Sequence, residues 1–127
     1  MTDGPAKIKS YAFALKVVNA VRDLQGKQKE FVLGKQLLRA GTSIGANVAE
    51  AEAGQSKRDF VAKMAIASKE ARESLYWLRL LKDSKIIEEP VAGELIADVE
   101  ELIRILTSIV KTAQNKLSRQ RSGTTKH

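Results

Sequence analysis

The sequence has no cysteine and one histidine, the terminal His127. Without cysteine the chain has no disulfide, no thiol nucleophile and no cysteine-ligated zinc. A single terminal histidine also argues against a histidine general base and against a histidine-rich metal site. We therefore expect no catalytic residue, no bound metal and no cofactor, and we predict that the protein is not an enzyme.

Two partial motifs leave this expectation unchanged. Glu70 and Glu73 have the spacing of half a carboxylate di-iron site, but the Glu-x-x-His pairs that such a site needs are absent from the sequence. The segment from Gly41 to Gly45 has no lysine where a phosphate-binding loop requires one. Neither motif supports metal-dependent or nucleotide-dependent chemistry.

Long uncharged runs are missing as well. No stretch approaches the ~18 apolar residues that a membrane-spanning helix needs. Residues 1–10 contain Asp3, Lys7 and Lys9 and lack the apolar core of a signal peptide. We therefore expect a cytoplasmic protein with no membrane partner.

The composition predicts a single all-helical domain. The chain has 127 residues, of which 43% are hydrophobic and 29% charged, and this balance is typical of one globular domain. Aromatic residues make up only 5%, while Ala, Leu, Ile, Val, Lys and Glu dominate. We read this composition as favouring an all-α fold.

Hydrophobic periodicity predicts four helices. The first runs from about Ile8 to Gln25, and Gly26 follows where a C-terminal cap is expected. The second covers about Lys29 to Ala53. We expect the first helix to bury one recurring face, formed by Tyr11, Leu15, Val18 and Val21 or Arg22.

The second helix carries small residues on one side. Gly41, Gly45 and Ala49 follow one another at a spacing of four, so two helix backbones can approach closely there. Glycine costs up to about 1 kcal/mol in a helix interior, and a close packing contact would offset that cost. We expect this side to pack against another helix or another subunit, and Gly45→Leu to overpack it.

The third and fourth helices have clear starts and apolar seams. Ser56 is a good N-cap with Asp59 three residues later, and Pro90 suits the first turn of the fourth helix. Short loops between the helices imply an antiparallel up-down bundle. The two seams are Phe60, Met64, Ala67, Ala71, Ser74, Leu78 and Leu81, and Leu95, Val99, Leu102, Leu106, Ile109 and Ala113.

A second apolar row accompanies the seam of the fourth helix. Two adjacent rows make a stripe wider than one neighbouring helix covers, which predicts a homo-oligomer. In the alternative, both rows face the interior of one four-helix bundle. The second row consists of Ile96, Ile103, Val110 and Leu117.

Three segments resemble one known family. They are residues 43–51 (SIGANVAEA), the helix start at Ser56, Asp59 and Phe60, and residues 70–78 (EARESLYWL). The family is the four-helix-bundle family encoded in intervening sequences of bacterial 23S rRNA genes, formerly called ribosomal protein S23, and the similarity spans about residues 10–117. The resemblance implies an up-down bundle assembled as a homopentameric barrel. The family is similar in fold to the accessory variability determinant of diversity-generating retroelements, which implies nucleic-acid binding beside a reverse transcriptase.

The charge is positive and unevenly placed. Lys and Arg outnumber Asp and Glu by 22 to 15, giving +7, and residues 105–127 hold five bases and no acid. A positive protein attracts polyanions such as RNA or DNA. We divide the chain into a bundle over residues 1–117 and a flexible basic tail over 118–127, in which Arg119, Arg121 and Lys126 are candidate phosphate contacts.

The third helix has a basic face with an aromatic residue in it. At 100° per residue its members fall within about 80° of one another. Guanidinium groups can bind phosphate oxygens, and a phenol ring can stack on an unpaired base. In the alternative, this is a solvated face whose arginines pair with Glu73 or with acids of the fourth helix. The face consists of Arg58, Lys69, Arg72, Tyr76 and Arg79.

Two functions of different classes remain open. The first is a non-enzymatic accessory protein that binds nucleic acid as a basic homo-oligomer, and the second is a structural or protein-interaction oligomer whose charge serves solubility. Asn47, Glu50 and Glu70 are expected to form a polar network at a helix crossing or subunit joint, where mutual hydrogen bonds offset burial. Salt-dependent binding to RNA or DNA separates the two functions.

Overall fold

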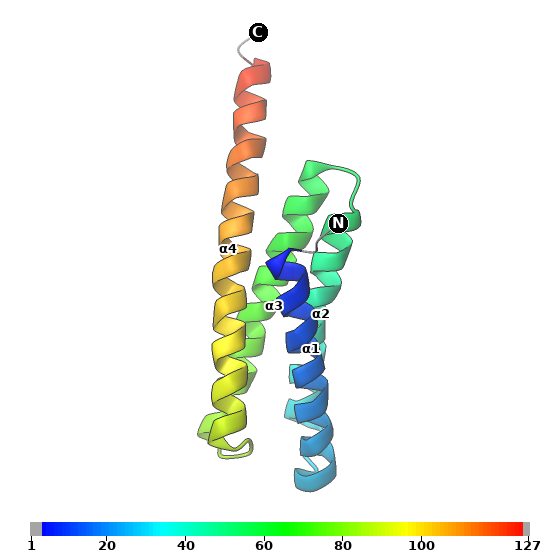
Figure 1. The fold of residues 1–127 in the computed structure, drawn as a ribbon, viewed down its shortest axis with the longest axis vertical. Helices are drawn as coiled ribbons and strands as arrows, with labels where there is room; N and C mark the ends of the chain where they lie inside the picture. The colour runs from blue at the N-terminus through cyan, green and yellow to red at the C-terminus, as the bar shows by residue number, and fades with distance from the viewer. Residues whose placement is uncertain (1–3, 126–127) are drawn as a thin grey trace.

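The computed structural model describes residues 4–125, with side chains described for residues 4–120. The chain forms four α-helices: α1 (Pro5–Asp23), α2 (Val32–Ala53), α3 (Lys57–Asp83) and α4 (Glu89–Thr125). The described residues contain no strand. Consecutive helices run up and down beside one another (Figure 1). The predicted all-α architecture of four helices is therefore confirmed.

The connection between α1 and α2 differs from the sequence prediction. A π-helical turn, η1 (Leu24–Gln28), continues α1, so Gly26 lies inside this turn and does not cap the helix. The chain reverses at Lys29, whose φ of 53° is in the left-handed region, and the Leu24 carbonyl accepts the Glu30 N–H at 3.1 Å. The Glu30 carboxylate then accepts the Leu33 N–H at 2.9 Å, and α2 begins at Val32 instead of Lys29.

The predicted helix start at Ser56 is present. The Ser56 hydroxyl accepts a hydrogen bond from the Asp59 backbone N–H at 3.0 Å, which satisfies one of the free donors in the first turn of α3. Pro90 is the second residue of α4, where its missing N–H costs nothing.

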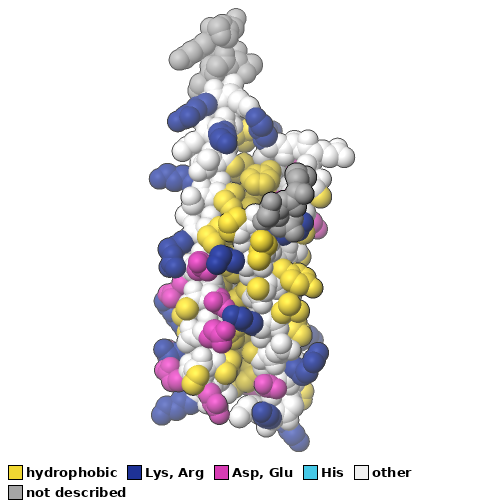
Figure 2. Space-filling view, in the orientation of Figure 1, with side chains coloured by type: hydrophobic (Ala, Val, Ile, Leu, Met, Phe, Trp, Pro, Cys, Tyr) yellow, Lys and Arg dark blue, Asp and Glu magenta, His cyan; other side chains and the backbone are white. Residues whose placement is uncertain are grey.

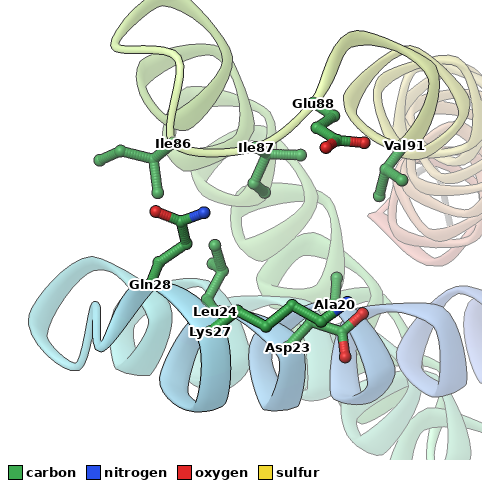
Figure 3. A pocket seen from close by; sticks show the side chains of 9 residues that line it. All are labelled: Ala20, Asp23, Leu24, Lys27, Gln28, Ile86, Ile87, Glu88 and Val91. Atoms are coloured by element: carbon green, nitrogen blue, oxygen red, sulfur yellow. The ribbon is translucent and has the colours of Figure 1, made fainter.

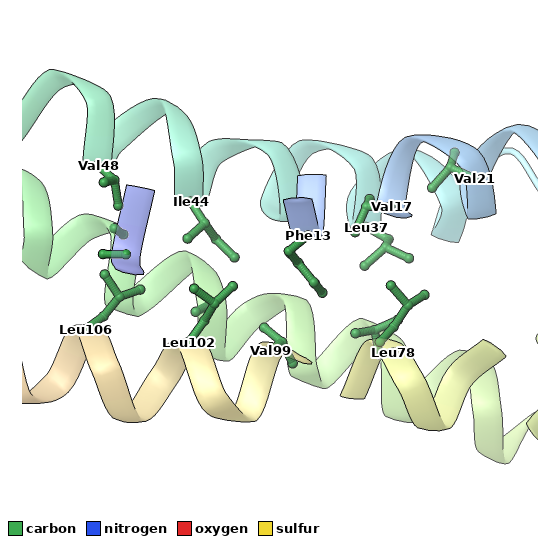
Figure 4. Close-up of a cluster of buried hydrophobic side chains, with 14 of the residues drawn as sticks. Phe13, Val17, Val21, Leu37, Ile44, Val48, Leu78, Val99, Leu102 and Leu106 are labelled. Carbon is green, nitrogen blue, oxygen red and sulfur yellow. The ribbon is translucent and has the colours of Figure 1, made fainter. Parts of the chain in front are cut away.

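One apolar cluster lies along the middle of the bundle (Figure 4). The predicted seam of α3 is buried from Met64 to Leu81, and Phe60, in the first turn of the helix, is half-buried. On α4 the seam is buried from Leu95 to Leu106, while its last members are half-buried. The largest fully buried side chains are Phe13, Leu37, Ile44, Met64, Leu78, Leu81, Leu95, Leu102 and Leu106.

The predicted buried face of α1 is wrong for most of its members. Tyr11 and Leu15 are 67% and 51% exposed, Val18 is half-buried and Arg22 is exposed. Of the expected face, Val21 is buried. The helix carries two largely apolar rows, and the row that contains Phe13 and Val17 fills the core. The buried row is Ala6, Ser10, Phe13, Val17 and Val21.

The small residues of α2 lie against α1 of the same chain. A Cβ added at Gly41 would lie 2.9 Å from Val17 Cγ2, so the missing side chain is what lets the two helices approach. A Cβ at Gly45 would lie 3.5 Å from the Ser10 backbone oxygen, which is ordinary contact. Ala49, the third predicted member, is exposed.

The second apolar row of α4 also turns inward. Ile96, Ile103 and Val110 are half-buried and pack against the core cluster. This row therefore contributes to the bundle itself, as the alternative interpretation of the sequence had it.

The last helix projects beyond the rest of the bundle (Figure 1). α3 has 27 residues and the antiparallel α4 has 37, so the C-terminal part of α4 has no neighbour of equal length. The sequence predicted a flexible tail from residue 118, whereas the structure continues α4 through Thr125. No helix in residues 4–125 combines the length and apolarity needed to span a membrane.

The contact at Gly41 yields a stability prediction. Gly41→Ala should lower the free energy of unfolding by about 1 to 3 kcal/mol, because the added methyl group overpacks the core. Its neighbour Val17 is buried and β-branched, so it has little freedom to turn away. Chemical denaturation measures the loss.

The matched control is Gly45→Ala, which adds the same methyl group where there is room for it. The higher helix propensity of alanine should leave this variant as stable as the wild type or more stable. Equal losses in both variants would contradict the close approach at Gly41.

Candidate functional site

Basic side chains of α1 bind the acidic half of α4. The Lys16 ammonium lies 2.8 Å from both Glu94 and Asp98, and Lys9 lies 3.0 Å from Glu101. The hydrogen bonds to Asp98 and Glu94 raise the pKa of Lys16 above its ordinary value. These contacts fasten α1 to α4 and place two ammonium groups against three carboxylates.

Two further acids of α4 pair with α3. Arg79 lies 3.7 Å from Glu100, and Lys82 lies 3.6 Å from Glu89. Of the six acids between residues 86 and 104, five therefore have a basic partner within 4.0 Å. The acidic half of α4 is largely neutralised inside the chain.

The bases that follow on α4 have no such partners. Arg104, Lys111, Lys116 and Arg119 are exposed, and none of them has an acidic group within 4.0 Å among the described residues. Figure 2 shows acidic side chains on the lower part of α4, beside α1, and Lys and Arg side chains without acids on its projecting upper part. The positive charge of the chain is therefore concentrated toward this end.

The predicted basic face of α3 divides into two groups. Arg58 and Lys69 are exposed and have no ion pair in the part of the chain that the structure describes, and Tyr76 is 60% exposed with its ring edge-on to Trp77 at 5.0 Å. Arg79 instead pairs with Glu100, as the alternative interpretation expected. Arg72 turns toward α4 and donates a hydrogen bond to the Thr107 hydroxyl at 3.0 Å.

Arg72 and Lys111 lie together in a shallow groove between α3 and α4, which we call the α3–α4 groove. It encloses about 220 Å³. Sequence reasoning missed Lys111, because its position beside Arg72 in one groove depends on how α3 and α4 pack. In the sequence, the polar residues around Lys111 on α4 were the signal that could have identified it. The groove is lined by Ala65, Ser68, Arg72, Thr107, Val110, Lys111 and Gln114.

The predicted contacts of the C-terminal tail are partly placed. Arg119 is an exposed residue of α4, on the projecting part of the helix. Arg121 belongs to the same helix, and Lys126 lies outside the described residues. Arg119 thus extends the line of unpaired bases that begins at Arg104.

The predicted network of Asn47, Glu50 and Glu70 does not form. Asn47 donates to the Ser43 carbonyl at 2.8 Å, and Glu50 pairs with Lys63 at 3.0 Å. Glu70 is bound elsewhere, by Arg39 at 3.2 Å. The three residues lie on helix faces with different neighbours, so each finds its own partner.

Arg39 is the centre of a polar cluster that the sequence analysis did not identify. Its guanidinium contacts both Glu70 and Glu73, and the Trp77 indole N–H donates to Glu73 at 3.2 Å. The Glu70 side chain is only 12% exposed, so the ion pair with Arg39 offsets the cost of burying its carboxylate. This cluster joins α2 to α3.

A small cleft of about 130 Å³ lies at the opposite end of the bundle (Figure 3). Its walls are apolar side chains of α1, η1, α4 and the loop before α4, and its polar groups are Asp23, Lys27, Gln28 and Glu88. Two carboxylates beside one ammonium give it no preference for a polyanion. The described residues also contain no group of three or more acidic or histidine side chains that could hold a metal ion.

Comparison with known proteins identifies the family. The model of the 23S rRNA-intervening sequence protein family matches residues 6–108. The chain belongs to this family. A solved structure from Bacteroides thetaiotaomicron, described as a protein of unknown function from the S23 ribosomal protein family, is 47% identical with a TM-score of 0.82. The match covers 84% of this chain and 98% of that one. No curated protein matches the chain.

The family match ends inside α4. It stops at residue 108, whereas α4 continues to Thr125, and the Bacteroides chain is matched almost completely while part of this chain is left over. The C-terminal part of α4, with Lys111, Lys116 and Arg119, therefore lies outside the matched region. Arg72 and Thr107 lie within it.

The Arg39 cluster gives a second stability prediction. Arg39→Ala should lower the free energy of unfolding by about 1 to 3 kcal/mol, because it leaves the mostly buried Glu70 carboxylate without its charged partner. Chemical denaturation at neutral pH measures the change.

Lys63→Ala is the control, since it breaks a pair in which the Glu50 side chain is 61% exposed. An exposed pair contributes at most about 1 kcal/mol. If the two substitutions lower the free energy of unfolding equally, the ion pair between Arg39 and Glu70 contributes no more than an exposed pair.

Proposed function

We propose that this protein is a non-enzymatic accessory protein that binds nucleic acid through the α3–α4 groove and the bases of α4. One observation carries the proposal: five of the six acids between residues 86 and 104 have a basic partner within the chain, while Arg104, Lys111, Lys116 and Arg119 are exposed and have no acidic partner among the described residues. A phosphate backbone is a ligand that such a row of bases fits.

The groove offers several kinds of phosphate contact. Arg72 supplies a guanidinium and Lys111 an ammonium, and Ser68, Thr107 and Gln114 supply hydroxyl and amide donors. All of these groups bind phosphate oxygens in protein–DNA complexes. The Arg72–Thr107 hydrogen bond holds the guanidinium at the groove before any ligand arrives.

Self-association is the second part of the proposal. Ile8, Tyr11 and Leu15 form an exposed apolar row on α1, which we call the α1 stripe, and they are 55%, 67% and 51% exposed. Adjacent exposed apolar side chains are typical of a protein interface. The second row of α4 packs within the bundle, so the α1 stripe is now the surface that supports a homo-oligomer. The resemblance to the family implies that this oligomer is a pentamer.

A structural or protein-interaction oligomer without a nucleic-acid role is the alternative, and the α1 stripe alone would serve it. A reverse transcriptase as partner and a cytoplasmic location belong to the proposal through the resemblance to the family. The neighbouring genes would test the reverse transcriptase.

Binding should depend on salt through the groove. In fluorescence anisotropy with labelled duplex DNA, the logarithm of affinity should fall linearly with the logarithm of salt concentration, by about 0.9 per neutralised phosphate. Replacing Arg72 and Lys111 by Ala together should reduce this slope by up to about 1.8. Circular dichroism should show an unchanged helix content, since both side chains are exposed.

Arg79→Ala is the matched control, because it removes a positive charge that already pairs with Glu100. It should change the slope less than either Arg72→Ala or Lys111→Ala. If wild-type protein bound neither RNA nor DNA at low salt, this result would contradict the proposed function and favour the structural alternative.

The α1 stripe should mediate self-association. Leu15→Glu places a charge in the stripe and should shift the protein toward the monomer in light scattering at micromolar concentration. Ile66→Glu is the control, since Ile66 is a comparably exposed apolar residue, at 41%, on α3. A wild-type protein that is already monomeric, or an effect equal in both variants, would contradict this interface.

A further inference from the structure

The projecting end of α4 is a single helix. Lys116 is the last residue of α4 that lines a cleft shared with α3, opposite Lys57, and the helix continues for nine residues to Thr125. At 1.5 Å per residue this end is about 13 Å long. A single α-helix is about 10 to 12 Å wide, and the major groove of B-form DNA is about 12 Å wide and 8.5 Å deep.

The C-terminal half of α4, from Arg104 onward, has two different sides. Ile109, Ala113 and Leu117 are half-buried and continue the apolar seam. At 100° per residue, the opposite side, which we call the outer face of α4, covers an arc of about 100°. All its members are exposed, and no acid occurs after Glu101 in the sequence. The outer face consists of Arg104, Ser108, Lys111, Asn115, Ser118 and Arg119.

The residue types of the outer face fit base edges as well as phosphates. Asparagine can bind adenine and arginine can bind guanine through two hydrogen bonds in the major groove, and serine can bind either base. Ser118 and Arg119 lie on the projecting end and Asn115 lies one turn before them, while Arg104 and Lys111 lie nearer the body of the bundle. Bases in that position suit the flanking phosphates.

Other forms of nucleic acid fit this end less well. Single-stranded binding relies on aromatic side chains that stack on bases, and the sequence has no aromatic residue after Trp77. The major groove of A-form RNA is deep and too narrow for side chains to read. The shape and chemistry of the projecting end therefore favour duplex DNA.

We propose that the outer face of α4 inserts into the major groove of B-form duplex DNA. The proposal rests on the proposed nucleic-acid function and specifies its ligand. Asn115, Ser118 and Arg119 contact base edges, and Arg104 and Lys111 contact the phosphates at the side of the groove. Because the family match ends at residue 108, the base-contacting part belongs to this chain's extension of α4.

The test compares full-length proteins on three labelled ligands of one mixed sequence: a 20-base-pair DNA duplex, the same duplex in RNA and the single DNA strand. Wild-type protein should bind the DNA duplex at least about tenfold more tightly than the other two, because the RNA groove and the single strand offer no site for the helix. Asn115→Ala and Arg119→Ala should each weaken DNA binding by about fivefold or more, as expected for a lost contact to a base.

Two controls separate this result from a general loss of charge or of folding. Arg22→Ala removes an exposed base from the last turn of α1, at the opposite end of the bundle from the projecting end of α4, and should leave DNA affinity within about twofold, since it takes away at most one phosphate contact (Figure 1). Asn115→Ala changes no charge, so a loss of affinity in this variant is not electrostatic. Circular dichroism should show that all variants keep the helix content of the wild type.

Dimethyl sulfate reports which groove is occupied, because it methylates guanine N7 in the major groove and adenine N3 in the minor groove. Bound wild-type protein should protect guanine N7 and leave adenine N3 reactive, and Asn115→Ala and Arg119→Ala should reduce the protection. Equal affinity for the DNA and RNA duplexes, or guanine N7 that stays reactive in the complex, would overturn the major-groove proposal while the proposed function stands. A protein that binds none of the three ligands would overturn both.

Discussion

The close approach of α1 and α2 at Val17 and Gly41 fixes how α1 is rotated about its axis. With a Cβ at Gly41 only 2.9 Å from Val17, this position admits no side chain, and Val17 takes the space instead. The rotation places Phe13 in the core and turns Leu15 outward. It also brings Lys16 within 2.8 Å of Glu94 and Asp98, so the charge balance of α4 depends on the same contact.

Most of the fold follows from local sequence signals. The cap at Ser56, the proline at the start of α4 and the 4-3 seam of α3 each depend on residues within one helix, and the structure has all three. The buried face of α1 could not be predicted in this way, because two rows were apolar and the choice depended on a glycine in α2. The π-helical turn at Leu24–Gln28 carried no recognisable signal.

The candidate site was only partly predictable, for a related reason. Helical spacing correctly places Arg58, Lys69, Arg72 and Tyr76 near one face of α3, but it gives no information on the partner of each side chain. Arg79 faces Glu100 and Arg72 faces Thr107 and Lys111, and both arrangements arise from the register of α3 against α4. The length of α4 was underestimated because its last turns have no apolar pattern to mark them.

The projecting end of α4 divides the protein into regions of different local stability. Its last backbone hydrogen bonds have no tertiary packing behind them, and an isolated helix of this length is marginal in water. These turns therefore open at a small fraction of the free energy that opens the core, and their amide protons exchange with solvent earlier. A ligand that holds this end would slow exchange there by closing the local openings, and it would also raise the free energy of global unfolding because it binds only the folded helix. Occupancy would thus be visible first as a change in amide exchange at the end of α4, where the unbound protein opens most easily.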